Sequence, residues 1–186
     1  MTLYGGNSRN STFTFIEIQN RQYPSIHSKE AMGSLMKWSM KGRLKIHTFS
    51  FDENFKQYDA ENFMNFLLDE NSELSYVLTE KEKSEFLYKI FFHLSIGGEL
   101  CQNEDNINEY AEFARKIYRD IISVQKNAET KELQIVSLVY KVRAEDESGA
   151  VFPSDVEHVN TFAYVIVDPF KRNAILLHHV FGCGEF

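Results

Sequence analysis

The last third of the chain, Lys131–Phe186, constrains the fold most, because its residue pattern predicts antiparallel strands. Two runs, Leu133–Ala144 and Thr161–Val167, are dense in Val, Ile, Leu, Tyr and Phe, which are enriched in strands. Asp168-Pro169 supplies a turn, and a third apolar run, Ala174–Phe181, follows it. We therefore expect consecutive antiparallel strands in this part of the chain.

The first of these runs has apolar residues on both of its faces. Leu138 and Tyr140 alternate with Ile135 and Val139. Because such a strand has no polar side to turn toward water, the pattern predicts a central strand that helices cover on at least one side. We interpret the segment that follows, Glu145–His158, as a polar loop.

The earlier part of the chain carries the spacing of amphipathic helices. Polar side chains able to accept hydrogen bonds from first-turn amides mark the expected helix starts, which are Ser28, Asp59, Thr79 and Asp105 or Asn106. Glycines mark two of the expected ends, at Gly42 and at Gly97-Gly98. The last two helices are therefore expected to form a helical hairpin.

A chain of 186 residues is long enough to bury one sizeable core. Alternating residues add strands at Phe13–Ile18 and Leu44–Phe51 to those of the last third. The expected fold class is α+β, a mostly antiparallel sheet with amphipathic helices packed on it. We expect a single domain over residues 12–183, behind a flexible tail at residues 1–11.

The overall charge limits the classes of partner. A formal net charge of −7 argues against binding to nucleic acid or to an anionic membrane, because both need a positive surface. The start of the chain lacks the features of a secretory signal, and no apolar stretch is long enough for a membrane span. With only two cysteines, a reduced protein of the cytoplasm is expected.

No residue pattern in the sequence matches a known catalytic or metal-binding motif. His178 and His179 are adjacent on an expected strand, so their side chains face opposite sides and cannot share a metal ion. Cys183 lies between two glycines. These flexible neighbours could present a nucleophilic thiol, but they are also typical of a strand end that frays. We expect no catalytic residue, no metal and no cofactor, and keep a small enzyme that uses these three residues as an alternative.

The segment Lys37–Arg43 stands out, because the single tryptophan lies among basic residues in an acidic chain. Trp and Arg are enriched at interface hot spots, so Trp38, Lys41 and Arg43 are candidates for binding a protein partner. The alternative is a core tryptophan at a helix end, with cations that interact favourably with the C-terminal end of the helix dipole.

The same segment begins a resemblance to a known family. The matching segments, in chain order, are Lys37–Arg43, Phe49–Asp52 with Phe55, Glu85-Phe86, His93-Leu94, Gly97–Gln102, Glu104-Asp105, Ile117–Asp120, Ser123–Asn127, Thr130-Lys131, Thr161-Phe162, Ile166–Pro169, and Gly182 with Gly184. In this order they resemble the cilia- and flagella-associated protein 300 family over most of the chain. Members of that family have an additional segment where this chain has only residues 69–78.

The resemblance implies a protein without enzymatic activity that is needed for assembly or transport of the outer and inner dynein arms of motile cilia. It implies cytoplasmic dynein-arm assembly factors, axonemal dynein subunits and the intraflagellar transport machinery as partners. It implies residence in the cytoplasm and in the motile cilium or axoneme. A constitutive structural component of the axoneme is the alternative from the same resemblance.

Overall fold

The computed structural model describes residues 2–3, 13–51, 80–127, 130–147 and 149–186. Among the sequence-based expectations, the helix that would begin at Asp59, the cap at Thr79 and most of the tail at residues 1–11 lie outside the described residues.

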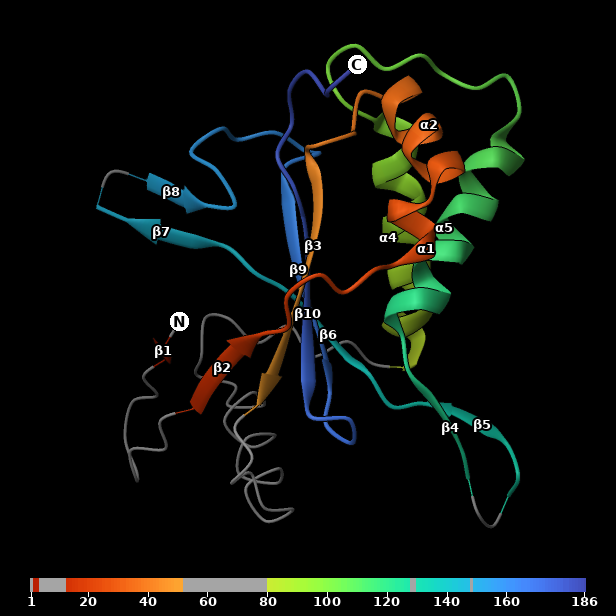
Figure 1. The fold of residues 1–186 in the computed structure, drawn as a ribbon, viewed down its shortest axis with the longest axis vertical. Coiled ribbons are helices and arrows are strands. Elements are labelled where there is room, and N and C mark those ends of the chain that lie inside the picture. Colours follow the sequence, from red (N-terminus) through yellow and green to blue (C-terminus); the bar gives the residue numbers. More distant parts are fainter. Residues whose placement is uncertain (1, 4–12, 52–79, 128–129, 148) are drawn as a thin grey trace.

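The centre of the fold is an antiparallel sheet (Figure 1). Its order is β1-β2-β3-β10-β9-β6, and the strands are β1 (Thr2–Leu3), β2 (Phe13–Glu17), β3 (Leu44–Phe51), β10 (Asn173–His179), β9 (Phe162–Asp168) and β6 (Leu138–Lys141). Every described pair in this sheet is antiparallel. The expected fold class, α+β with a mostly antiparallel sheet, is confirmed.

The β9–β10 hairpin lies inside the sheet, with β3 beside β10 and β6 beside β9. Asp168 ends β9, and its Oδ1 accepts hydrogen bonds from the amides of Phe170 and Lys171, both at 2.9 Å. A side chain that binds its own backbone in this way stabilises a tight turn. The turn expected from Asp168-Pro169 is therefore confirmed.

The long run Leu133–Ala144 does not form one central strand, and that expectation is wrong. The run divides into β5 (Leu133–Ile135), β6 and β7 (Ala144–Asp146), and β6 lies at one end of the described sheet. Both faces of β6 are apolar because both are covered: Val139 packs in the main core, and Tyr140 packs on the opposite side of the sheet. The two strands at the middle of the described order are β3 and β10.

The expectation of a loop over Glu145–His158 is also wrong in its first half. β7 pairs with β8 (Gly149–Phe152) in a two-stranded hairpin beside the main sheet. Gly149 has φ of +120°, a conformation that other residues rarely adopt. This glycine, which the sequence offered only as a loop residue, sits where β8 begins.

Four described helices cover one face of the sheet (Figure 1). They are α1 (Pro24–His27), α2 (Lys29–Lys37), α4 (Glu80–Ile96) and α5 (Ile107–Ile121). The expected cap at Ser28 is confirmed, since its hydroxyl accepts from the amide of Ala31 at 3.2 Å. Of the two candidates for the α5 cap, Asn106 is the one used, and its Oδ1 accepts from the amide of Asn108 at 3.0 Å.

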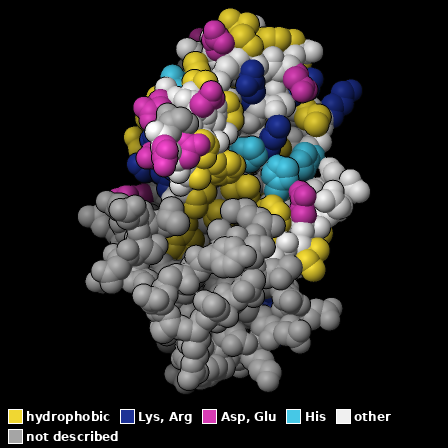
Figure 2. All heavy atoms as spheres, turned by 90° about the vertical axis from the view of Figure 1, so that its left-hand side faces the viewer, with side chains coloured by type: hydrophobic (Ala, Val, Ile, Leu, Met, Phe, Trp, Pro, Cys, Tyr) yellow, Lys and Arg dark blue, Asp and Glu magenta, His cyan; other side chains and the backbone are white. Residues whose placement is uncertain are grey.

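The main core fills the space between these helices and the sheet. It is built from buried side chains of every described helix and of strands β3, β6, β9 and β10, among them Leu35, Ile90, Ile117, Ile166 and Leu177. A smaller cluster of Tyr140, Val167 and Ala174 lies on the opposite face. Figure 2 looks onto that face, where histidine side chains gather beside hydrophobic ones. No helix in the described ranges is long and apolar enough to cross a membrane.

Candidate functional site

Three segments that are distant in sequence meet at one end of the fold. They are Lys37–Arg43 after α2, Gly97–Glu104 between α4 and α5, and Gly182–Glu185 after β10, and we call their meeting point the junction. All three belong to the segments that carry the family resemblance. We therefore treat the junction as the candidate functional site.

The end of α2 gives the first segment its shape. α2 ends at Lys37, earlier than the sequence-based assignment to Gly42, because Ser39 adopts a left-handed conformation with φ of 56°. The amides of Met40 and Lys41 then donate back to the carbonyl of Leu35, at 2.7 and 3.0 Å. Such bonds close a helix and turn the chain sharply away from its axis. Gly42, with φ of 74°, belongs to the turn that leads into β3.

Trp38 is a core residue and not a surface anchor. Its side chain is 1% exposed, and its ring lies 4.8 Å from that of Tyr110 and 5.0 Å from that of Phe113, measured between centroids. A buried ring cannot contact a partner directly, so the expected surface role of Trp38 is withdrawn. The structure has the alternative that the sequence left open, a core tryptophan at a helix end.

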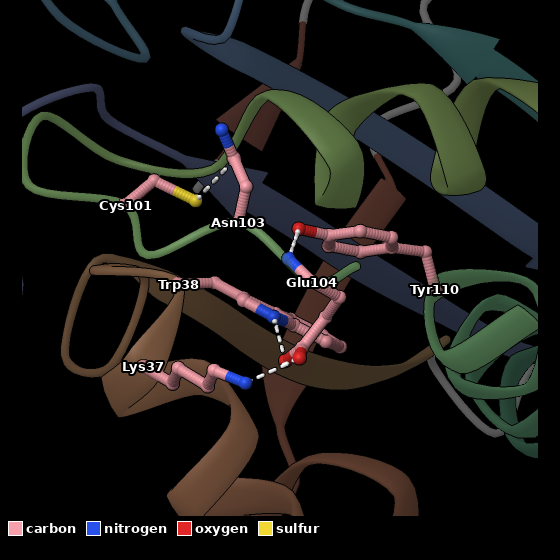
Figure 3. A network of polar contacts seen from close by, with 6 residues as sticks. All are labelled: Lys37, Trp38, Cys101, Asn103, Glu104 and Tyr110. Atoms are coloured by element: carbon pink, nitrogen blue, oxygen red, sulfur yellow. Dashed lines mark hydrogen bonds and ion pairs between the residues drawn. The ribbon is translucent and has the colours of Figure 1, made fainter. Parts of the chain in front are cut away.

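Glu104 ties the first two segments together (Figure 3). One carboxylate oxygen accepts from the indole Nε1 of Trp38 at 2.8 Å, and the other pairs with Lys37. The amide of Glu104 donates to the hydroxyl of Tyr110 at 2.9 Å. The hydrogen bond from Lys37 is the main cause that holds the pKa of Glu104 below its ordinary value. The same bond raises the pKa of Lys37. Glu104 is therefore the polar centre of the junction.

Glycines let the three backbones touch. The amide of Gly98 donates to the carbonyl of Trp38 at 2.8 Å, and a Cβ atom on Gly98 would lie 2.0 Å from the carbonyl oxygen of Ser39. The amide of Gly184 donates to the hydroxyl of Ser39 at 2.9 Å, and a Cβ atom there would lie 2.6 Å from the carbonyl carbon of Ser39. No other residue fits at these positions without moving a backbone.

A buried polar network around Asn160 contacts the junction at Gly97. Asn160 donates through Nδ2 to the carbonyls of His93 and Gly97, at 3.0 and 2.7 Å. Its Oδ1 must then accept from His93 Nδ1 at 2.7 Å, which leaves His93 Nε2 to accept from the hydroxyl of Tyr164 at 3.0 Å. Burial lowers the pKa of His93 to about 4, so this ring is neutral near pH 7.

The residues of the alternative enzyme do not form a catalytic set. His179 is fully buried and its Nδ1 binds the carbonyl of Asn160 at 2.5 Å, whereas His178 stacks on His47 on the other face of the sheet. The two histidines thus face opposite sides, as their adjacency predicts. The described residues contain no group of three or more side chains able to hold a metal ion.

Cys183 is exposed, but its environment opposes activation. Its Sγ donates to Oε2 of Glu99 at 3.2 Å, and this carboxylate raises the pKa of the thiol. A nucleophilic cysteine needs the opposite, a neighbouring cation or base that lowers the pKa. At Cys101, burial raises the pKa.

A surface pocket of about 420 Å³ opens beyond the end of β6. Its lining mixes Val156 and Val159 with Lys141 and Arg143. Arg143 is paired with Glu157 in the same lining. The pocket therefore presents apolar surface, Lys141 and the paired Arg143, and not a recognisable catalytic arrangement.

The outer surface of the junction offers side chains to a partner. Arg43 donates through Nε to the carbonyl of Cys183 at 2.9 Å and stays partly exposed, as does Lys41. Binding of a partner by Lys41 and Arg43 stays a prediction. Leu100 is 53% exposed, and Met36, in the last turn of α2 just before the junction, is 39% exposed. Sequence reasoning missed Leu100, although an apolar residue in a short loop after Gly97-Gly98 was the available signal.

Comparison with known proteins finds a family whose model matches the sequence of this chain. The model of the family "Cilia- and flagella-associated protein 300" matches residues 12–67 and 64–179. A curated relative of that name from Chlamydomonas reinhardtii is 31% identical over 123 residues, which are 66% of this chain and 48% of the relative. One from Paramecium tetraurelia is 33% identical over 134 residues, which are 72% of this chain and 50% of the relative. The chain therefore aligns with about half the length of these relatives. No solved structure matches.

Proposed function

The chain belongs to the cilia- and flagella-associated protein 300 family, and on that premise we propose that it acts as an adaptor in the assembly or transport of axonemal dynein arms. Association with cilia or flagella follows from the family. The role in outer and inner dynein arms, and the activity as an adaptor without catalysis, are the proposal.

The observation that carries the proposal is how the polar groups of the junction are used. Glu104 and Ser39 bind other parts of the junction, and Asn160 binds the junction from outside it, at the carbonyl of Gly97, so these groups hold the three segments together. Of the junction's side chains, Leu100 is exposed and Lys41 and Arg43 are partly exposed, and these three are suited to contact another protein. A docking surface needs polar groups that fix its shape and exposed apolar and cationic side chains that contact the partner. The junction has both.

The proposed partners are cytoplasmic dynein-arm assembly factors, axonemal dynein subunits and the intraflagellar transport machinery. An adaptor that meets these partners would work both in the cytoplasm and in the motile cilium. The enzyme alternative receives no support from the site, because the hydrogen bond to Glu99 raises the pKa of the Cys183 thiol.

Co-precipitation from the cytoplasm of ciliating cells tests the adaptor role. We expect the tagged full chain to recover axonemal dynein heavy chains or their assembly factors, and the Leu100→Asp variant to lose them. Ile107→Asp is the matched control, because Ile107 is also exposed, at 63%, but lies at the start of α5. Equal recovery by all three proteins would remove the junction as the docking surface, and absence of dynein components from all three would overturn the adaptor role.

The second candidate, a constitutive axonemal component, differs in where the protein stays. A component of the finished axoneme should resist salt extraction and be equally abundant in full-length and growing cilia. An assembly or transport adaptor should be enriched in growing cilia and in the cytoplasm.

A further inference from the structure

A two-stranded arm extends away from the helices and the main sheet (Figure 1). It consists of β4 (Val124–Lys126) and β5 (Leu133–Ile135), and the residue pairs are Val124 with Ile135, Gln125 with Gln134, and Lys126 with Leu133. Paired residues share a face, and successive residues alternate between faces. One face of the arm is therefore Val124, Lys126, Leu133 and Ile135, and the other carries the two glutamines.

The first of these faces is apolar and largely open to water. Val124 is 57% exposed and Leu133 is 74% exposed, and no other large hydrophobic side chain in the described ranges is more exposed than Leu133. Ile135 is partly buried against the main core, so the face is continuous with the body of the protein. An exposed ribbon of two strands gains little stability from its own packing, and exposed apolar patches mark interaction sites.

The base of the arm is held firmly. The amide of Ser123 donates to the hydroxyl of Ser137 at 2.8 Å, and the amide of Val136 donates to the carbonyl of Ser123 at 3.0 Å. Lys171, in the β9–β10 turn, donates through Nζ to the hydroxyl of Ser123 at 2.8 Å. This bond joins the arm to a turn whose Phe170 is 69% exposed.

The charges around this surface have the opposite sign to the chain as a whole. Lys126 lies on the apolar face of the arm, and Lys171 and Arg172 lie in the adjoining turn. The carboxylates beside them are the exposed Glu132 and the buried Asp168, which pairs with Lys171 at 3.6 Å. Within the described part of the chain, no ion pair involves Lys126 or Arg172. The formal net charge of the chain is −7, so this surface is a local cationic exception.

We propose that the arm face, Val124, Lys126 and Leu133, together with Phe170, Lys171 and Arg172 of the turn, docks an acidic, extended segment of a partner protein. Apolar side chains of that segment would cover Val124 and Leu133, and its carboxylates would face Lys126 and Arg172, with Lys171 beside them. Complementary charge of this kind favours an acidic partner and speeds its association.

Other occupants fit the charges less well. In a two-fold symmetric pair of this chain, the patch would meet itself and bring like charges together. A lipid bilayer with anionic headgroups would attract the three cations but repel the acidic remainder of the chain. The inference goes beyond the proposed function, because it concerns a surface built from elements other than the junction.

Nuclear magnetic resonance on the ¹⁵N-labelled full chain tests the proposal. The probe is a synthetic peptide that alternates glutamate with valine, and its partner probe has lysine in place of each glutamate. We expect the acidic peptide to shift the signals of residues 124–126, 133–135 and 170–172 in a saturable manner that weakens with added salt. The lysine peptide should leave these signals unchanged.

A pair of double variants separates the two faces of the arm. Val124→Thr with Leu133→Thr should weaken binding of the acidic peptide at least about tenfold, because the apolar anchors are lost while strand propensity is kept. Gln125→Thr with Gln134→Thr changes the opposite face in the same way and should alter the affinity by less than about twofold.

Four results would overturn the proposal. One is equal binding of both peptides, and another is equal weakening by both double variants. A third is absence of any shift with the acidic peptide, whether or not vesicles of phosphatidylserine and phosphatidylcholine shift the same signals. The fourth is a dimer, seen by light scattering, that only the Val124→Thr/Leu133→Thr variant dissociates. None of these results bears on whether the protein is needed for dynein arms.

Discussion

The indole nitrogen of Trp38 lies 2.8 Å from Oε1 of Glu104, which is 66 positions later in the chain. This bond joins the end of α2 to the segment that leads into α5, and it places a carboxylate over a buried aromatic cluster. Since Glu104 also pairs with Lys37, one side chain fixes both residues at the helix end. Glu104 thus holds two segments of the junction together, and Leu100 on the outside of the junction is exposed.

Replacing Trp38 tests how much its hydrogen bond to Glu104 contributes to the stability of the fold. Trp38→Phe keeps a buried ring but removes the indole N–H, which leaves one oxygen of Glu104 without its donor. We expect a loss of about 1–3 kcal/mol in the free energy of unfolding, measured in urea, and a loss of about 3–5 kcal/mol for Trp38→Ala because a large cavity is added. A Trp38→Phe protein as stable as the wild type would show that the bond contributes nothing.

Gly98 and Gly33 form a contrasting pair. Gly98→Ala would force a Cβ atom against the carbonyl of Ser39, and backbone cannot yield as a flexible side chain can. We expect destabilisation by about 3 kcal/mol, the upper end of the range for overpacking. Gly33 lies in α2 with nothing within 4 Å of the position of its Cβ, so Gly33→Ala should stabilise by about 0.5–1 kcal/mol. Equal effects in thermal unfolding would contradict the close contact at Gly98.

Acid should weaken the fold through its buried histidines. Burial lowers the pKa of His93, and likewise that of His179, to about 4 from an ordinary value of 6.5. Between those values the unfolded chain binds more protons than the folded one, so stability falls as the pH drops from about 6.5 to about 4. Each histidine could contribute up to about 3 kcal/mol to this loss. Urea unfolding at a series of pH values measures it.

The His93→Gln variant is the control for this pH dependence. Glutamine keeps an amide that can both donate and accept, but it does not titrate. The variant should show a smaller decline in stability over the same pH range than the wild type. An identical pH profile would mean that titration of His93 does not contribute to the loss of stability in acid.

The thiol of Cys183 should react slowly in spite of its exposure. The carboxylate of Glu99 raises the pKa of this thiol, which reduces the fraction of reactive thiolate near pH 7. Iodoacetamide should therefore alkylate Cys183 more slowly than a free cysteine peptide, and Glu99→Gln should raise the rate. Mass spectrometry of the digested protein distinguishes Cys183 from Cys101. Rapid alkylation in the wild type would indicate an activated thiol and would favour the alternative of an enzyme that uses Cys183.

Local patterns in the sequence predicted the local structure well. The caps at Ser28 and Asn106 and the turn at Asp168 depend on bonds within a few residues, so residue type and spacing suffice to find them. The fold class follows from the same kind of evidence. In contrast, the position of β6 at the end of the described sheet depends on its neighbours, and an apolar pattern on both faces only reports that both faces are covered.

The site could be predicted only in part. The sequence drew attention to Lys37–Arg43, but the burial of Trp38 depends on Tyr110, Phe113 and Glu104, whose spacing along the chain carries no signal. The network around Asn160 is similar, because its partners lie more than 60 residues away. Long-range polar contacts of this kind become visible only when the fold is known.

We propose that the protein is needed to place dynein arms on the axoneme. Cryo-electron tomography of cilia from cells that lack the protein measures this most directly, with cells that express the restored wild-type chain as the control. We expect both outer and inner arms to be missing or strongly reduced, and to return with the restored chain. Axonemes that keep both rows of arms at normal occupancy without the protein would show that the protein is not needed to place them.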